Sequence, residues 1–162
     1  MGIPQSSSLS ASIGIKYDSR NNLINPTKGL YYFTIIESGN KINKGPDEIL
    51  DIYSYKKEIT NRRISMDFES YLQVFNRQIL SLSFHGRRIT SNESEIPLTD
   101  QFRLGGTRSL RGYREDQFRG TSIAWTNIEY RYLFGPLSRA FIFFDAGYYS
   151  QNNMSENNKM GY

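Results

Sequence analysis

Apolar and polar residues alternate with a period of two in five segments of the chain, and this pattern limits the fold more than any other feature. Successive side chains of a strand point to opposite faces of a sheet, so each segment predicts a strand with one apolar and one polar face. The five segments are residues 9–17, 65–75, 79–87, 122–134 and 139–149. A sixth strand is predicted over residues 30–38, which are rich in Tyr, Phe, Ile and Thr, although its two faces cannot be told apart. The sequence therefore predicts an all-β fold, an antiparallel meander of about six long strands.

Alternation alone fits a soluble β-sandwich at least as well as a membrane β-barrel, and two further features favour the barrel. The strands approach the roughly 9–11 residues that cross a bilayer when tilted. The connections also alternate in length, a pattern typical of outer-membrane barrels. Residues 76–78 and 135–138 are tight turns, whereas residues 39–61 and 90–118 are long and polar. Residues 18–29 are the exception, since they should lie on the side of the short turns but span twelve residues.

Composition agrees with a barrel and excludes several classes of site. The chain has 12 Tyr and 10 Phe but one Trp, and aromatic residues suit strands and membrane interfaces. It has no cysteine, so disulfides and thiolate metal sites are excluded, and no apolar run approaches the ~20 residues of a transmembrane helix. Six strands cannot close a membrane barrel, since small ones need about eight. We therefore expect residues 1–162 to be part of a larger barrel domain that lacks strands at both ends and carries no soluble N-terminal repeats.

The segment from Phe102 to Gly120 is unusual because it gathers glycines and arginines among aromatic residues. It is too basic for an ordinary core and too rich in glycine for a helix. Long irregular loops are uncommon and often functional. The sequence therefore identifies the connection over residues 90–118 as a candidate functional loop.

Four motifs, in order along the chain, resemble the C-terminal barrel region of the BamA/TamA superfamily of outer-membrane assembly and translocation proteins, the bacterial surface antigen type. The first two are a turn signature with Asp18, Pro26 and Gly29, and a loop whose core is Leu110, Arg111, Gly112 and Tyr113. The last two are the acidic Glu129 of the next strand and a Phe-x-Asp-x-Gly motif centred on Asp145. The likeness covers nearly the whole chain. We call residues 90–118 the signature loop.

The resemblance implies that the signature loop folds back into the barrel lumen, where its Arg contacts acidic residues of the wall. Glu129 and Asp145 lie on the polar faces of neighbouring strands, and a planar guanidinium suits paired carboxylates. We therefore expect Arg111 to be held by these two residues and Tyr113 to pack beside it. Gly105, Gly106 and Gly112 are expected to provide tight turns and close approach. From the residues alone, Arg111 as a solvated loop arginine remains the alternative.

Other sites are less favoured. His85 is the only histidine, and no acidic residue near it in sequence is evident as an orienting partner for catalysis. The pair Asp67 and Glu69 is read as lumen lining. Acidic Glu115 and Asp116 interrupt the basic loop, and no nucleic-acid-binding motif accompanies it. We expect no enzyme activity, no cofactor, no metal and no nucleic-acid partner.

The function implied by the resemblance is non-enzymatic assembly, insertion or translocation of proteins at the outer membrane of a bacterium or an organelle equivalent. The implied partners are membrane lipid, unfolded outer-membrane client proteins and accessory lipoproteins. Three alternatives stay open: a transporter of the two-partner secretion type, the anchor barrel of a lipid hydrolase, and a soluble β-sandwich binding module.

Overall fold

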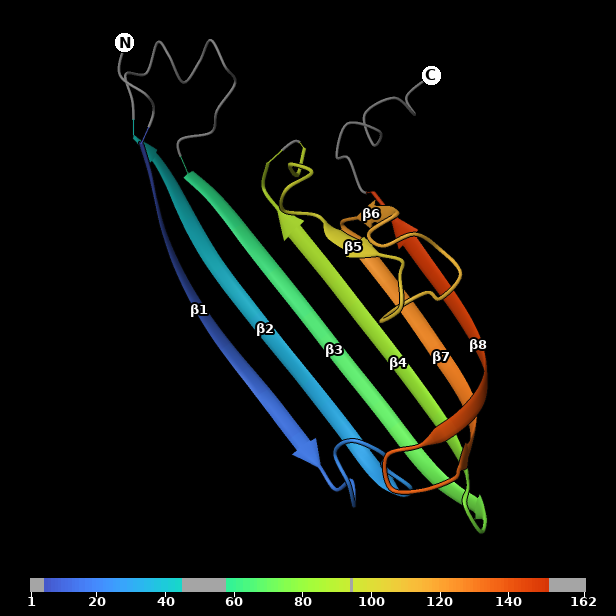
Figure 1. The fold of residues 1–162 in the computed structure, drawn as a ribbon. Coiled ribbons are helices and arrows are strands. Elements are labelled where there is room, and N and C mark those ends of the chain that lie inside the picture. The colour runs from blue at the N-terminus through green and yellow to red at the C-terminus, as the bar shows by residue number, and fades with distance from the viewer. Residues whose placement is uncertain (1–4, 45–57, 94, 152–162) are drawn as a thin grey trace, which may run out of the picture.

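Six long strands form one antiparallel sheet in the computed structural model, which describes residues 5–44, 58–93 and 95–151. The strand order is β1-β2-β3-β4-β7-β8, so each long strand pairs with its neighbours in the chain (Figure 1). In the described residues β1 and β8 form the two free edges, and the sheet is not closed. The long strands are β1 (Gln5–Asp18), β2 (Gly29–Lys44), β3 (Glu58–Phe75), β4 (Gln78–Ser91), β7 (Ser122–Leu133) and β8 (Arg139–Ser150).

One face of this sheet is apolar and exposed across all six strands, and we call it the outer face. Directly paired residues share a face, and the register places Ile13 opposite Ile36, Phe68 opposite Phe84 and Ile128 opposite Phe144. In the described residues no second sheet covers the outer face, which contradicts the soluble β-sandwich alternative. An apolar surface of this extent indicates contact with lipid. Its exposed members include Leu9, Ile13, Ile15, Ile36, Ile64, Phe68, Leu72, Phe84, Ile128, Tyr130, Ile142, Phe144 and Tyr148.

The register also assigns the two faces of β2, which the sequence pattern left open. Tyr32 lies opposite Phe68, so it belongs to the outer face, whereas Tyr31 and Phe33 lie opposite Glu69 and Asp67. Apolar residues therefore occupy both faces of this strand, which is why alternation was not visible there.

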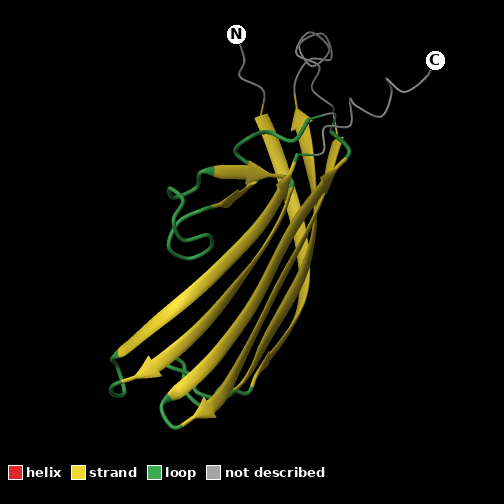
Figure 2. Cartoon of the chain, turned by 90° about the vertical axis from the view of Figure 1, so that its right-hand side faces the viewer, coloured by secondary structure: helices red, strands yellow, loops and turns green. Residues whose placement is uncertain are grey.

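The signature loop is less irregular than the sequence predicts. A short strand, β5 (Phe102–Leu104), lies within it, and a second, β6 (Phe118–Gly120), begins at its last residue; the two pair as a small second sheet. Figure 2 shows this unit standing against one side of the curved six-stranded sheet, near the end opposite the short turns. We call the side that it contacts the loop face. Because β5 and β6 have three residues each, their alternation was too short to detect.

The first four long strands are longer than predicted, reaching 18 residues in β3, whereas β7 and β8 agree with the predicted ranges to within one residue. The long connection expected over residues 39–61 is therefore shortened to residues 45–57, which lie outside the described residues. Residues 19–28 form the connection between β1 and β2, which is longer than the other turns at this end, as expected. Backbone hydrogen bonds order this connection. The amides of Ser19 and Asn21 donate to the carbonyls of Leu30 and Lys28, at 2.9 and 3.2 Å.

Candidate functional site

Three glycines shape the signature loop because each adopts a positive φ, a region that residues with a Cβ rarely enter. The φ angles are 120° at Gly105, 97° at Gly106 and 92° at Gly112. A Cβ on Gly105 would also lie 2.5 Å from the carbonyl oxygen of Arg114, whereas one on Gly112 would meet no atom within 4 Å. Gly105 thus provides both a turn and a close approach, and Gly112 provides the turn alone.

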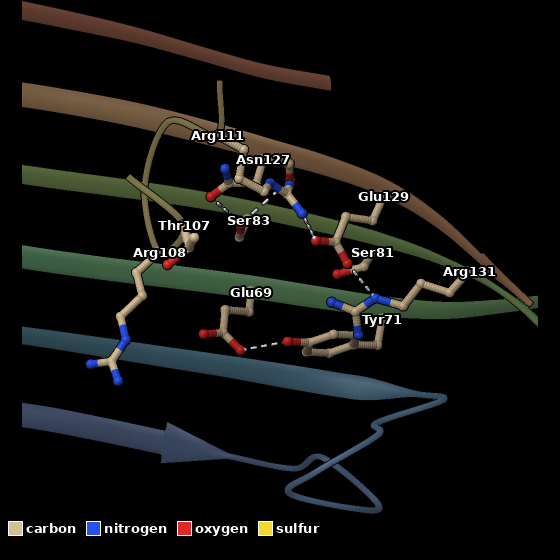
Figure 3. Close-up of a pocket in the computed structure, with 10 residues that line it drawn as sticks. All are labelled: Glu69, Tyr71, Ser81, Ser83, Thr107, Arg108, Arg111, Asn127, Glu129 and Arg131. Atoms are coloured by element: carbon tan, nitrogen blue, oxygen red, sulfur yellow. Dashed lines mark hydrogen bonds and ion pairs between the residues drawn. The ribbon is translucent and has the colours of Figure 1, made fainter. Parts of the chain in front are cut away.

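The structure brings Arg111, Glu129 and Asp145 together. Arg111 Nε and its backbone N–H donate to Asp145 Oδ2 at 2.8 and 3.0 Å, and Nη2 donates to Asp145 Oδ1 at 2.6 Å. Its Nη1 donates to Glu129 Oε1. Register explains the convergence, because Glu129 lies opposite Phe143 and Asn127 opposite Asp145 on the loop face. The two carboxylates therefore lie on the loop face of neighbouring strands, and Figure 3 shows Glu129 there beside Arg111.

Burial makes this ion-pair cluster strong. The Asp145 side chain is only 3% exposed, and Asn127 Nδ2 donates a further hydrogen bond to it at 2.8 Å. The carboxylate of Asp145 raises the pKa of Arg111 above its usual value, so Arg111 stays charged. Removing one partner of such a buried pair costs about 3–5 kcal/mol, because the other charge is left uncompensated.

The aromatic ring beside Arg111 belongs to Phe143 and not to Tyr113. The guanidinium carbon lies 3.9 Å from the Phe143 ring centroid, a favourable cation–π geometry. Tyr113 instead packs edge-to-face against Phe118, with centroids 5.1 Å apart. The sequence pattern could not separate these two rings, since Tyr113 lies two residues after Arg111 and Phe143 two residues before Asp145.

Leu110 anchors the loop through apolar packing next to the ion pairs. It forms a buried cluster with Leu104 and Ile123. A Cβ on Gly147 would lie 2.6 Å from Leu110 Cδ1, so the glycine of the Phe-x-Asp-x-Gly motif makes room for this leucine. The aromatic residues packed against the cluster are Phe102, Phe118 and Trp125.

The turn-signature residues lie at the opposite end of the sheet. Asp18 accepts hydrogen bonds from Arg20 Nε and Nη2 at 2.9 and 2.8 Å. Pro26 is buried. Gly29 has a φ of 110°, and a Cβ there would lie 2.3 Å from the carbonyl oxygen of Ser19. These residues define the turn and do not touch the signature loop directly.

Asp67 is the acidic partner of His85 that the sequence analysis missed. The two residues pair directly across β3 and β4, and His85 Nδ1 lies 2.6 Å from Asp67 Oδ1. Arg87 Nη2 donates to the same oxygen at 2.6 Å. His85 also stacks on Trp125, with centroids 4.7 Å apart. The side chains are 18 residues apart in the chain, so only strand register reveals the pair.

A polar pocket of about 170 Å³ lies between the loop and the sheet. Figure 3 shows its lining, in which Arg131 and Glu129 face Tyr71 and Glu69 across the wall. Arg131 Nε donates to Glu129 Oε2 at 2.5 Å, and the Tyr71 hydroxyl donates to Glu69 at 2.7 Å. Sequence reasoning did not single out Arg131 or Tyr71. Their signal was their position on the polar faces of the predicted strands.

Neither a metal site nor a membrane helix is found in the described ranges 5–44, 58–93 and 95–151. No group of three or more His, Cys, Asp or Glu side chains there could hold a metal ion. These ranges also contain no helix that is long and apolar enough to cross a membrane.

Comparison with known proteins relates this geometry to a family. The model of the Omp85 superfamily domain matches residues 4–161. A curated relative is the outer membrane protein assembly factor BamA of Nitratidesulfovibrio vulgaris (strain Hildenborough), 26% identical over 151 residues. This alignment covers 85% of the chain but 18% of that relative, so the chain spans less than a fifth of its length. The chain belongs to the Omp85 superfamily and is a segment of an outer-membrane β-barrel.

Proposed function

We propose that this domain is the signature-loop part of a barrel that assembles or inserts proteins in the outer membrane without a chemical step. In this proposal, residues 90–118 occupy the lumen, and Leu110, Arg111, Gly112 and Tyr113 form the locked tip. The single observation that carries the proposal is the Arg111 clamp on Glu129 and Asp145.

Two physical features support this role. A partly buried guanidinium paired with two carboxylates fixes one loop geometry, because leaving any of the three unpaired is costly. The outer face presents apolar side chains to lipid on every long strand. A barrel with a fixed internal loop and a lipid-facing wall can act on the bilayer around it without a nucleotide or a cofactor.

The partners in this proposal are membrane lipid, unfolded outer-membrane client proteins and accessory lipoproteins. Membership of the Omp85 superfamily and similarity to an outer membrane protein assembly factor support outer-membrane proteins as the clients. The domain is proposed to be non-enzymatic, with Arg111, Glu129 and Asp145 holding the loop and transforming no substrate.

The test is a double-mutant cycle in the full-length protein that carries this domain. Arg111→Ala, Asp145→Ala and the double variant are expressed in cells in which the wild-type copy is depleted, and folded client barrels are counted by heat-modifiable migration. We expect each single variant to lower client assembly by about tenfold. The double variant should lower it by no more than either single variant, because both substitutions remove the same clamp.

Arg108→Ala and Arg114→Ala are the matched controls, since both are arginines of the same loop without an ion pair to Glu129 or Asp145. We expect them to leave assembly within about twofold of the wild type. Independent, additive losses from Arg111→Ala and Asp145→Ala would contradict the proposal. If the Arg111→Ala variant assembles client barrels normally but fails to export a soluble client, the result would favour a transporter of the two-partner secretion type instead.

A further inference from the structure

A chain of polar contacts connects the β1–β2 turn to the clamp of the signature loop. It begins at Arg20, whose Nη1 donates to Glu69 Oε2 at 3.0 Å while its other nitrogens hold Asp18. The Tyr71 hydroxyl donates to the same Glu69 oxygen at 2.7 Å. The first half of the chain therefore joins the turn to the wall of β3.

The second half runs from β3 to the loop. The Arg131 guanidinium lies 5.3 Å from the Tyr71 ring centroid, and Arg131 Nε donates to Glu129 Oε2 at 2.5 Å. The other oxygen of Glu129 accepts from Arg111. Figure 3 shows Glu69, Tyr71, Arg131, Glu129 and Arg111 following one another along the lining of the pocket.

Each member of this chain is largely shielded from water. The charged side chains of Arg20, Glu69, Glu129 and Arg131 are 10–21% exposed. Shielding strengthens each contact, and Glu129 has both carboxylate oxygens engaged by different arginines. Moving Arg131 would therefore disturb the oxygen arrangement that Arg111 meets.

We propose that Arg20, Glu69 and Arg131 are positioning residues that couple the β1–β2 turn to the signature loop through Tyr71 and Glu129. The turn signature and the loop signature, 91 residues apart at Arg20 and Arg111, then form one mechanical unit. The meaning of this coupling for assembly rests on the proposed function. The coupling itself depends only on contacts within this chain, and it can be measured by amide hydrogen exchange without a client.

The test measures amide hydrogen exchange of residues 104–113 in the full-length protein reconstituted in liposomes, without a client. We expect Arg20→Ala and Glu69→Ala each to speed exchange in this loop by about fivefold or more, a coupling of ordinary size. In an Arg111→Ala background, Arg20→Ala should add nothing, because the coupling acts through the clamp. Arg20→Lys keeps the positive charge. We expect its exchange in residues 104–113 to be slower than that of Arg20→Ala, and this variant keeps the test usable if Arg20→Ala folds poorly.

Lys28→Ala is the matched control, because it removes a cation from the same turn and its side chain is exposed. We expect it to leave loop exchange unchanged. Loop exchange unchanged by Arg20→Ala would overturn the coupling, and so would an increase that persists in full in the Arg111→Ala background. Failure of the proposed function is separate, since it is judged by client assembly in the Arg111→Ala variant.

Discussion

At the scale of single residues, the signature loop depends on two kinds of contact side by side. Arg111 supplies charge-assisted hydrogen bonds to Asp145 and Glu129, and Leu110 supplies apolar burial over Gly147. The ion pairs fix the direction of the loop because their geometry is specific. The leucine adds burial that has little directional preference.

Gly147→Ala tests the apolar half of this docking. The added Cβ would lie 2.6 Å from Leu110 Cδ1, so the leucine must shift within a packed cluster. We expect a loss of about 1–3 kcal/mol in the free energy of unfolding, measured by denaturant titration in micelles. Gly135→Ala is the control, because a Cβ there meets no atom within 4 Å. A cost that stays the same in a Leu110→Ala background would contradict the steric explanation.

At the scale of elements, each long strand separates a lipid-facing side from a polar side. Neighbouring residues of β1 illustrate this, since Ile13 pairs with Ile36 on the outer face and Ser12 pairs with Glu37 on the loop face. Alternation along the sequence predicts which residues lie on each face wherever the loop face is polar. In β2 the alternation is absent, because Tyr31 and Phe33 make the loop face apolar as well.

Ile13→Lys and Ser12→Lys form a matched pair for this division. Near the middle of a membrane strand, a lysine on the lipid face costs about 2–4 kcal/mol, because the ammonium loses water. The same lysine at residue 12 would lie opposite Glu37 and should change stability by less than about 0.5 kcal/mol. Unfolding of the full-length protein in lipid bilayers measures both changes. Equal costs at the two positions would argue against a lipid-facing outer face.

At the scale of the whole molecule, the curved sheet brings distant turns together at its short-turn end. Asn25 Nδ2, in the β1–β2 turn, donates to the carbonyl oxygen of Pro136 at 2.7 Å, and Arg139 Nη1 donates to Asn25 Oδ1 at 2.5 Å. These contacts join the turns at the two ends of the strand order (Figure 1). The length of the β1–β2 turn, exceptional among the short turns, is what allows this reach.

Asn25→Ala should therefore weaken the molecule as a whole. Asn25 is 7% exposed, and its loss leaves both Pro136 and Arg139 without this partner. We expect a loss of about 1–3 kcal/mol in the free energy of unfolding, measured by denaturant titration. Its effect should overlap with that of Arg139→Ala in a double-mutant cycle, since both variants remove the hydrogen bond between Asn25 and Arg139. Fully additive effects would show that the bond contributes nothing to stability.

Much of the fold and part of the site could be predicted from the chain alone. The six long strands, their antiparallel order and the placing of Glu129 and Asp145 on one wall follow from alternation and short turns, which are local signals. The small strands β5 and β6 could not be predicted, because three residues carry no detectable period. The contacts of Glu69, Tyr71 and Arg131 could not be predicted either, since they depend on which strands lie beside one another.

By itself, the sequence determined which residues of five of the six long strands face outward and which face inward, because a strand has a fixed period of two. In β2 only the register decided this. It also indicated where the chain turns, because Gly29, Gly105 and Gly112 lie in the predicted connections, and a positive φ such as these residues adopt favours glycine. Only the tertiary structure decided which inward-facing groups meet. Register placed Asp67 opposite His85, and the path of the loop placed Arg111 against Phe143, in contacts that no local pattern encodes. The residues in these contacts are far apart in sequence, and they come close together only when the strands pair and the sheet forms.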